Sequence, residues 1–324
     1  MFDEPLFFKP IMMERVWGGN HLEALFGKKI LPGKIIGESW ELSDRPEAQS
    51  VVDGGAFDGW TLRQLIEKHP REILGALPDA GRFPLLLKYV DAGDKLSVQV
   101  HPDDAGAKKY NDLGKSECWI IVRAERGAKI VRGLKPGTTR AAYERAVTEN
   151  RVEEVLHSFE PKVGDVVALP AGMVHAIGAG LVVAEIQQNS DLTFRIYDYG
   201  RMGLDGKPRK LHVQEALEAI RFEKPGTEFA GDMSRDTVAP IQDDDSGVEH
   251  LLTGKYFDLF RWTIQSELGY LTRNRALTVM AIEGNGLIGD RTVAAGTTML
   301  FPAAMKNVLI VPDKKLVLAI GRPK

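Results

Sequence analysis

The sequence predicts a mainly β protein with two copies of a β-barrel and a few helices inserted in or flanking the N-terminal half. Three observations lead to this prediction. Short apolar or alternating segments bounded by Gly, Pro and Asp recur along the chain. Helical spacing of apolar residues is confined to segments before residue 222. A spaced pattern of glycine, proline and a polar residue occurs once in each half.

In the N-terminal half, alternation and apolar runs predict strands, whereas spacing of three and four residues predicts helices. Thr61 can cap the first helix, and the second is expected to be broken near Asn150 and to contain His157. In chain order, the expected elements are short extended segments within 1–60, a helix at about 61–76, strands at 84–90, 96–101 and 117–122, a helical segment at about 138–158, strands at 163–170, 181–188 and 192–200, and a helix at about 213–220.

The length of 324 residues indicates two units, because one core usually serves fewer residues. The first unit is expected to span residues 1–222. Residues 223–247 are poor in apolar residues and rich in Gly, Pro and Asp, which is typical of a linker. Residues 248–324 contain short strand-like segments and little helical pattern, which favours a small antiparallel sandwich or barrel.

The repeated pattern describes a turn glycine, a strand and a proline turn that presents a polar side chain inward. Its two occurrences are Gly164, Pro170, Gly172 and His175, and then Gly296, Pro302, Ala304 and Asn307. Because Asn307 replaces His175 and no histidine follows His250, the second unit cannot build a histidine-rich metal site. We expect this unit to be structural and without metal ligands.

Charge and composition exclude several classes of partner. The 42 basic and 45 acidic residues are mixed without a basic block, so neither nucleic acid nor a membrane is expected as a partner. The N-terminal MFDEPLFFKP lacks the basic residues of a signal peptide, and no apolar stretch approaches the ~18 residues of a membrane helix. Cys118 is the single cysteine and is expected to be buried, which favours a reducing compartment, the cytoplasm.

The segment 96–101 is the first candidate for a functional site. As a strand it places Leu96, Val98 and Val100 on one face and Ser97, Gln99 and His101 on the other. Gln99 and His101 can then converge on one point in front of the sheet. Glu117 and His175 lie further along the chain, so the four side chains are candidates for a single metal site.

The pattern that ends at His175 resembles the second signature of the cupin superfamily, and Gln99, His101 and Glu117 resemble a modified first signature. More narrowly, LSVQVHPDD, GKSE and QQNSDLTFRIYDYG, together with RVWGG, GESWELS and PLLLKYV, resemble the short bacterial form of the type I mannose-6-phosphate isomerases. The resemblance covers essentially the whole chain. It implies two cupin jelly rolls (double-stranded β-helices), usually one zinc ion, and interconversion of mannose 6-phosphate and fructose 6-phosphate.

The same resemblance implies roles for individual residues. The zinc ligands of the family fall on Gln99, His101, Glu117 and His175, its functional arginine on Arg195, and its active-site lysine on Lys115. Longer family members carry an extra helical domain for which this chain has no room. Any pocket wall that this domain supplies must therefore be reduced here or built from other segments.

Three further residues are candidates for substrate binding. Lys88 interrupts an apolar run, so it either reaches the edge of the sheet or points into a polar site. Glu185 can orient His175 or shuttle a proton, or it can face outward. Ser97 shares the face of the ligands. For an aldose–ketose isomerase, such groups would surround a sugar that passes through an enediol.

Two alternatives remain beside a zinc-dependent isomerase. An iron-dependent bicupin dioxygenase would normally use three histidines, and Gln99 argues against it. A non-catalytic sugar-binding bicupin would have no need of Lys115 and Arg195 beside an intact ligand set. The expected partner is thus a small sugar phosphate, and the sequence carries no signal for the oligomeric state.

Overall fold

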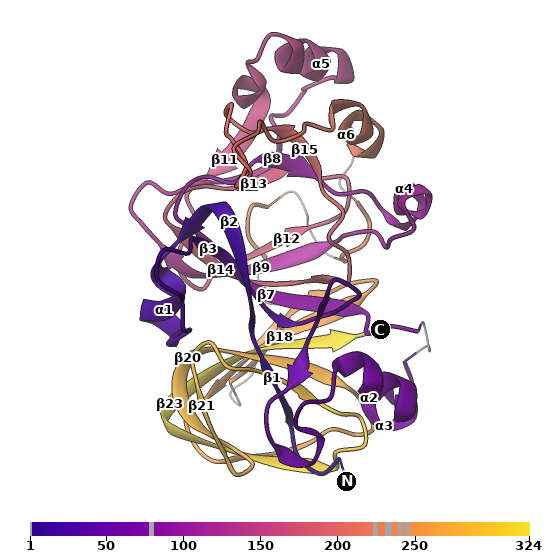
Figure 1. Cartoon of the computed structure of the whole chain (residues 1–324), viewed down its shortest axis with the longest axis vertical. Helices are drawn as coiled ribbons and strands as arrows, with labels where there is room; N and C mark the ends of the chain where they lie inside the picture. Colours follow the sequence, from indigo (N-terminus) through magenta and orange to yellow (C-terminus); the bar gives the residue numbers. More distant parts are fainter. Residues whose placement is uncertain (1, 78–80, 223–225, 231–234, 239–241, 244–246) are drawn as a thin grey trace.

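The computed structural model describes residues 2–77, 81–222, 226–230, 235–238, 242–243 and 247–324. Within these residues the chain is mainly β and its sheets are antiparallel, as predicted. Figure 1 shows two halves stacked along the long axis, with most strands from the first two hundred residues above and the C-terminal strands, together with β1, below. One buried apolar cluster contains residues of both halves, and the hydroxyl of Tyr89 in the upper half donates to the carbonyl of Ala281 in the lower half.

Two sheets form the upper half. In the described chain the larger sheet has six strands, in the spatial order β12 (Val166–Leu169), β9 (Glu117–Ala124), β14 (Leu181–Gln188), β7 (Leu85–Ala92), β2 (Ile11–Gly19) and β3 (Ile36–Leu42). The smaller sheet has the order β11 (Leu156–Phe159), β10 (Ile130–Leu134), β13 (His175–Ile177), β8 (Val98–Val100) and β15 (Phe194–Tyr197). Residues from both sheets, such as Trp119 and Ile177, share an apolar layer.

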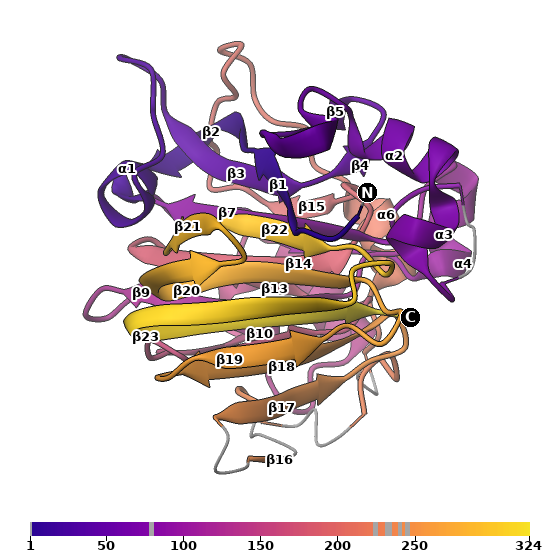
Figure 2. The same ribbon diagram turned by 90° about the horizontal axis from the view of Figure 1, so that it is seen from below.

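The lower half is one curled sheet that Figure 2 shows from below, with β17, β18, β23 and β20 side by side. Its described strands follow the order β16 (Gln242–Asp243), β17 (Val248–Thr253), β18 (Phe257–Ile264), β23 (Asn307–Pro323), β20 (Leu277–Ile288), β22 (Thr298–Phe301), β1 (Leu6–Lys9) and β6 (Val51–Val52), while β19 (Leu268–Leu271) pairs with β23 and β21 (Arg291–Ala294) pairs with β20.

The N-terminal strand β1 belongs to the lower half. Leu6 lies opposite Leu300 on β22, and the side chain of Phe7 is buried in the lower core. The unit predicted for residues 1–222 therefore contributes two short strands, β1 and β6, to the sheet of the C-terminal strands. The division at residue 222 itself stays a prediction.

The predicted linker, 223–247, lies in large part outside the described residues. The residues that are described make specific contacts with both halves. Phe229 is buried in the shared apolar cluster, and the backbone N–H of Val238 donates to the carbonyl of Val166. This part of the segment is thus packed against the protein.

Replacing Phe7 by alanine tests whether β1 supports the lower half. The ring is 5% exposed, and we expect Phe7→Ala to lower the free energy of unfolding by about 3 kcal/mol, the usual cost of emptying a buried aromatic site. Urea unfolding measures this change. Leu309→Ala is the control, because this side chain is 45% exposed and its loss should change stability by less than about 0.5 kcal/mol. Equal effects of the two changes would contradict the packing described above.

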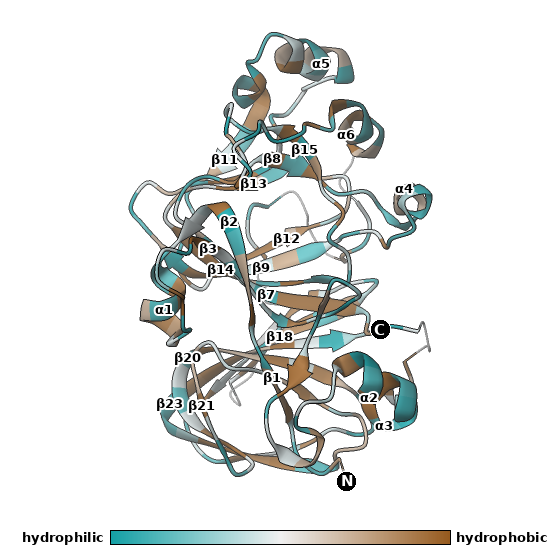
Figure 3. Ribbon diagram, in the orientation of Figure 1, coloured by the Kyte–Doolittle hydropathy of each residue, from teal (hydrophilic) through white to brown (hydrophobic). Residues whose placement is uncertain are grey.

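The helices lie mainly where the apolar spacing predicts them. The helix predicted at 61–76 is formed by α2 (Leu62–Lys68) and α3 (Pro70–Leu74), and Thr61 caps α2 through a reciprocal pair of hydrogen bonds with Gln64. The segment 138–158 contains α5 (Arg140–Thr148) and the 3-10 helix η3 (Val152–Val155), separated by Asn150 with a φ of 55°. The last predicted helix is α6 (Val213–Ala219). Figure 3 shows both hydrophilic and hydrophobic residues on α2 and α3, whereas β7, between the halves, is largely hydrophobic.

Several short elements differ from the prediction. His157 was expected in a helix but lies on β11, where its Nε2 is 2.7 Å from Asp236 Oδ1. The chain leaves the helical region at Leu156, whose extended backbone begins the pairing with β10. The elements that the sequence did not indicate include α1 (His21–Phe26), α4 (Asp104–Ala107), η1 (Gly55–Phe57), η2 (Lys108–Tyr110) and β10. The short extended segments expected within 1–60 include β4 (Asp44–Arg45) and β5 (Ala48–Gln49), which pair with each other. In the described part of the chain, no helix has the length and apolar character to cross a membrane.

The two copies of the repeated pattern adopt the same local geometry. Gly164 and Gly296 both have a φ of 89°, and their backbone N–H groups donate to the carbonyls of Ile121 and Ala281 in the strand alongside. A short strand and the predicted proline turn follow in each copy. The last position of the pattern is the first residue of the next strand, His175 on β13 and the corresponding asparagine on β23.

Candidate metal and substrate site

Three predicted site residues form one row across the smaller upper sheet. Gln99 on β8 lies opposite His175 on β13 and opposite Arg195 on β15. Residues directly opposite each other in an antiparallel pair project from the same face, so the three side chains share one face of the sheet. The sequence predicted that side chains alternate between the two faces of β8. The positions of Arg195 and His175 on either side of Gln99 result from the pairing of β15 and β13 with β8.

The opposite face of β8 is apolar, as predicted. Val98 and Val100 are fully buried in a cluster with Tyr143 of α5 and Leu217 of α6. Leu96 differs from the expectation, because it precedes the strand and packs in the apolar layer between the two upper sheets. The helices behind the sheet therefore support the strand that carries Gln99.

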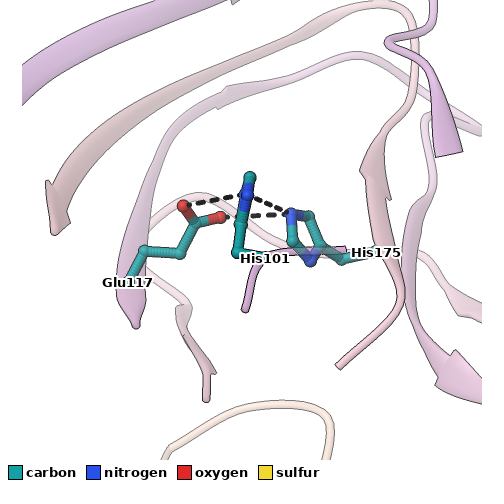
Figure 4. Close-up of side chains that lie close together, drawn as sticks. All are labelled: His101, Glu117 and His175. Atoms are coloured by element: carbon teal, nitrogen blue, oxygen red, sulfur yellow. Dashed lines mark hydrogen bonds and ion pairs between the residues drawn. The ribbon is translucent and has the colours of Figure 1, made fainter. Parts of the chain in front are cut away.

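His101, Glu117 and His175 converge on one point, as Figure 4 shows. The two histidine Nε2 atoms are 3.2 Å apart. Glu117 Oε2 is 3.6 Å from His101 Nε2, and Glu117 Oε1 is 3.4 Å from His175 Nε2. All three side chains are buried. They come from three different elements, since His101 follows β8, Glu117 begins β9 and His175 begins β13.

Backbone carbonyls set the orientation of both imidazoles. His101 Nδ1 is 2.8 Å from the carbonyl oxygen of Leu192, and His175 Nδ1 is 2.8 Å from that of Met173. Since a carbonyl only accepts, each Nδ1 carries the proton and donates it. Both Nε2 lone pairs are thereby directed to the shared point, as in metal sites where the second ring nitrogen is held in place.

Gln99 completes the predicted set. Its side-chain amide lies 3.4 Å from His175 Nε2, and the hydroxyl of Ser97 donates to Gln99 Oε1 over 3.4 Å. The two ends of an amide have nearly the same shape, so a half-turn about the last bond presents the oxygen to the shared point. Ser97 is therefore next to the ligand set, as the sequence predicted.

The donor set fits a divalent cation. Both carboxylate oxygens of Glu117 are buried and have no hydrogen-bond partner among the described residues, although the ammonium of Lys115 is 2.6 Å from Oε2. Two imidazole nitrogens, one carboxylate and an amide oxygen are ligands that zinc and similar ions accept. These residues could therefore hold one metal ion.

Burial keeps the two histidines neutral. It lowers the pKa of His175 to about 4, and the positive charge of Lys115 acts in the same direction. Burial also lowers the pKa of His101 well below its ordinary value, with contributions from Lys115 and His175. Neutral imidazole is the form that binds a metal, so both rings are in the ligating state at neutral pH.

A chain of buried charges joins the ligands to the neighbouring sheet. The ammonium of Lys115 is 3.0 Å from His101 Nε2 and 3.7 Å from Glu185 Oε1, and Lys88 Nζ is 3.3 Å from the same Glu185 oxygen. Trp119 Nε1 donates to Glu185 Oε2 over 2.9 Å. Lys88 and Glu185 thus both point into a polar site. The sequence had left open whether Lys88 reaches the edge of the sheet and whether Glu185 faces outward.

The charge states in this chain follow from burial and from the neighbours. Burial raises the pKa of Glu185, and the negative charge of Glu117 raises it further. For Lys88, burial disfavours the charged form, but Glu185 and Glu38 outweigh burial and raise its pKa. Lys88 is therefore an ammonium group, whereas the carboxyl of Glu185 is shifted toward neutrality, where it can both give and take a proton.

A cleft of about 560 Å³ opens in front of these side chains. Six of the predicted residues line it: Ser97, Gln99, Lys115, Glu185, Lys88 and Arg195. Arg195 is half-buried, and its Nη1 donates to the carbonyl of Lys210 over 2.9 Å. It therefore lies inside the cleft and is not part of a surface ion pair.

The cleft is also lined by charged residues that were not singled out from the sequence, among them Arg15, Glu38, Asp191 and Arg209. Arg15 Nη2 and Trp40 Nε1 both donate to Glu38 Oε2, and these bonds, with Lys88, lower the pKa of Glu38 to about 2 although burial alone would raise it. Each of these residues is a single charge in an ordinary segment. The one available signal was the presence of Arg15, Glu38 and Asp191 within or beside segments that the family resemblance already contained.

The chain is similar in sequence and in structure to proteins of one enzyme family. The family described as phosphomannose isomerase type I, catalytic domain, matches residues 6–119. Mannose-6-phosphate isomerase ManA of Bacillus subtilis (strain 168) is 39% identical over 288 residues, which cover 88% of this chain and 88% of that protein. A mannose-6-phosphate isomerase of Streptococcus mutans is 34% identical over 94% of each chain. A solved structure of the mannose 6-phosphate isomerase from Bacillus subtilis covers 98% of this chain and 99% of that chain, with a TM-score of 0.87 and 32% identity. This chain belongs to the type I mannose-6-phosphate isomerase family.

Proposed function

We propose that the protein is a zinc-dependent aldose–ketose isomerase that interconverts mannose 6-phosphate and fructose 6-phosphate. The convergence of His101, Glu117 and His175 on one buried point beside a polar cleft is the observation that supports this function most. With the amide of Gln99 these residues would hold one zinc ion per chain. The names of the related proteins give the same substrate.

The reaction transfers a hydrogen from C2 of the open-chain aldose to C1, while the C1 carbonyl becomes a hydroxyl and the C2 hydroxyl becomes a carbonyl. We infer that the intermediate is an enediol. Bound zinc would supply Lewis-acid polarisation of the sugar oxygens at the point where the negative charge develops. The remaining requirements are a group that exchanges protons with the sugar and a cation near the developing oxyanion.

Lys115 and Glu185 meet the first requirement. They are in contact, both line the cleft, and the raised pKa of Glu185 suits a group that alternates between acid and base. Lys88 holds Glu185 in place from the other side. Arg195 meets the second requirement, because its guanidinium lies in the same cleft one strand away from Gln99.

We also propose that the fold is a pair of cupin jelly rolls. The upper half, residues 1–222, would be the catalytic copy, and residues 248–324, with β1 and β6, the copy without metal ligands. The matching geometry at Gly164 and Gly296 supports this proposal, as does the position of His175 and Asn307 at the start of the following strand.

Removal and return of the metal tests the proposed function. We expect the purified protein to convert mannose 6-phosphate in a coupled assay, to lose this activity on chelation, and to regain it with one equivalent of zinc. Activity that survives complete metal removal would contradict the zinc-dependent reaction. Oxygen consumption with bound iron and no isomerisation would favour the dioxygenase, and zinc binding without turnover would favour a sugar-binding protein.

A further inference from the structure

The segment that follows β15 gathers three arginines around one buried carboxylate. Arg209 Nη1 lies 3.2 Å from Asp198, and the charges of Arg201 and Arg195 act on the same carboxyl group. Arg201 also reaches Asp94 at 3.6 Å. Arg195 has no carboxylate within ion-pair distance among the residues that the structure describes. Around Asp198, positive charge therefore exceeds negative charge.

This excess charge is removed from water. Burial lowers the pKa of Arg209, and the neighbouring charge of Arg195 lowers it further, while Asp198 opposes both. Burial also lowers the pKa of Arg195, and the negative charge of Asp198 opposes this shift only in part. Bringing two guanidinium groups together beside a single carboxylate in a partly desolvated site is unfavourable unless a further anion binds there. The pair thus favours an anionic ligand.

Both guanidinium groups keep hydrogen-bond donors for such a ligand. Arg195 Nε is buried and has no hydrogen-bond partner among the described residues. The single hydrogen bond that the guanidinium of Arg209 donates within the described chain goes to Asp198. A guanidinium has five N–H donors in a planar fork, which matches the oxygens of a phosphate group.

The position of the pair agrees with the shape of a sugar phosphate. Arg195 and Arg209 line the same cleft as Gln99, Lys115 and Glu185. Arg195 is in register with Gln99 on the neighbouring strand, and Arg209 lies beyond it in the chain segment that follows β15. In a hexose 6-phosphate the phosphate is attached to C6, at the opposite end of the carbon chain from the reacting C1 and C2. A sugar with C1 and C2 at the ligand cluster would extend its phosphate along this wall.

We propose that Arg209, with Arg195 beside it, binds the phosphate group of the sugar phosphate. The identity of the sugar rests on the proposed function, but the anion site rests on the arrangement of the arginines alone. Arg15, which lines the same cleft from β2, adds positive charge on the neighbouring sheet.

Arg209→Gln in the zinc-loaded protein tests the proposal. We expect the KM for mannose 6-phosphate and the dissociation constant for inorganic phosphate to rise about ten- to hundred-fold, the effect of losing a hydrogen bond to a charged group, whereas kcat should change far less. Lys207→Gln is the matched control. It removes the same charge from the same loop, but Lys207 is exposed and does not line the cleft.

Arg209→Lys keeps the charge beside Asp198 and loses the planar fork, so a smaller rise in both constants is expected. If the Arg209→Gln protein fails to fold, Arg209→Lys serves as the test instead. Unchanged phosphate affinity in a folded Arg209 variant would overturn the phosphate site, even where the wild type converts mannose 6-phosphate. If the wild type binds phosphate through Arg209 but does not convert the sugar, the proposed function fails and the anion site stands.

Discussion

The His175→Ala variant should lose its metal and its isomerase activity together. His175 Nε2 is within 3.4 Å of Glu117, His101 and the amide of Gln99, so the change removes one ligand from the centre of the set. Losing a group that merely orients a ligand can cost about 10–100-fold in metal affinity, and the loss of a ligand itself should cost at least as much. We expect kcat/KM to fall at least about a hundred-fold as well.

Metal analysis after dialysis and the coupled isomerase assay measure the two effects. His157→Ala is the matched control, because this histidine lies on β11 with Asp236 as its partner and does not belong to the ligand set. The control should keep its metal and its activity. A His175→Ala protein with full metal content would show that this histidine is not a ligand.

The Arg195→Ala variant should lose turnover and keep its metal. The guanidinium lies in the cleft, but it makes no hydrogen bond or ion pair with His101, Glu117 or His175 among the described residues. The removal of one group that stabilises charge in the transition state typically lowers kcat by about 10²–10³. We expect a loss of this size, with a metal content equal to that of the wild type.

Arg145→Ala controls for the loss of an arginine, since Arg145 is exposed on α5 and remote from the cleft. Equal metal loss in Arg195→Ala and His175→Ala would show that Arg195 supports the ligand set and that its assigned role is wrong. A rise in KM without a fall in kcat would show that Arg195 acts on the phosphate alone, and it would contradict the role of Arg195 in turnover.

Local patterns in the sequence were sufficient for much of the fold. The alternation around Gln99 placed Gln99 and His101 on the polar side of a strand, and the spacing after Thr61 located α2 and α3. These features depend on neighbours within a few residues, where periodicity is informative. The very short helices α1 and α4 were not predicted, because so few residues show no recognisable periodicity. The strand position of His157 was not predicted either, because pairing of β11 with β10 overrides the local helical pattern.

The site was predictable only in part. The ligand set followed from spaced motifs and from the family resemblance, but the row formed by His175, Gln99 and Arg195 depends on the register between strands far apart in the chain. Arg15 and Arg209 were not predicted as site residues, because each is an isolated charge in the sequence and reaches the cleft only in the folded chain. The pairing of β1 with β22 likewise joins the two ends of the sequence.

Anomalous scattering from zinc-loaded crystals tests the central claim most directly. We expect one strong zinc peak per chain, at about 2.0–2.2 Å from the Nε2 atoms of His101 and His175, an oxygen of Glu117 and the amide oxygen of Gln99. Zinc bound elsewhere, or bound by fewer than three of these four side chains, would contradict the account.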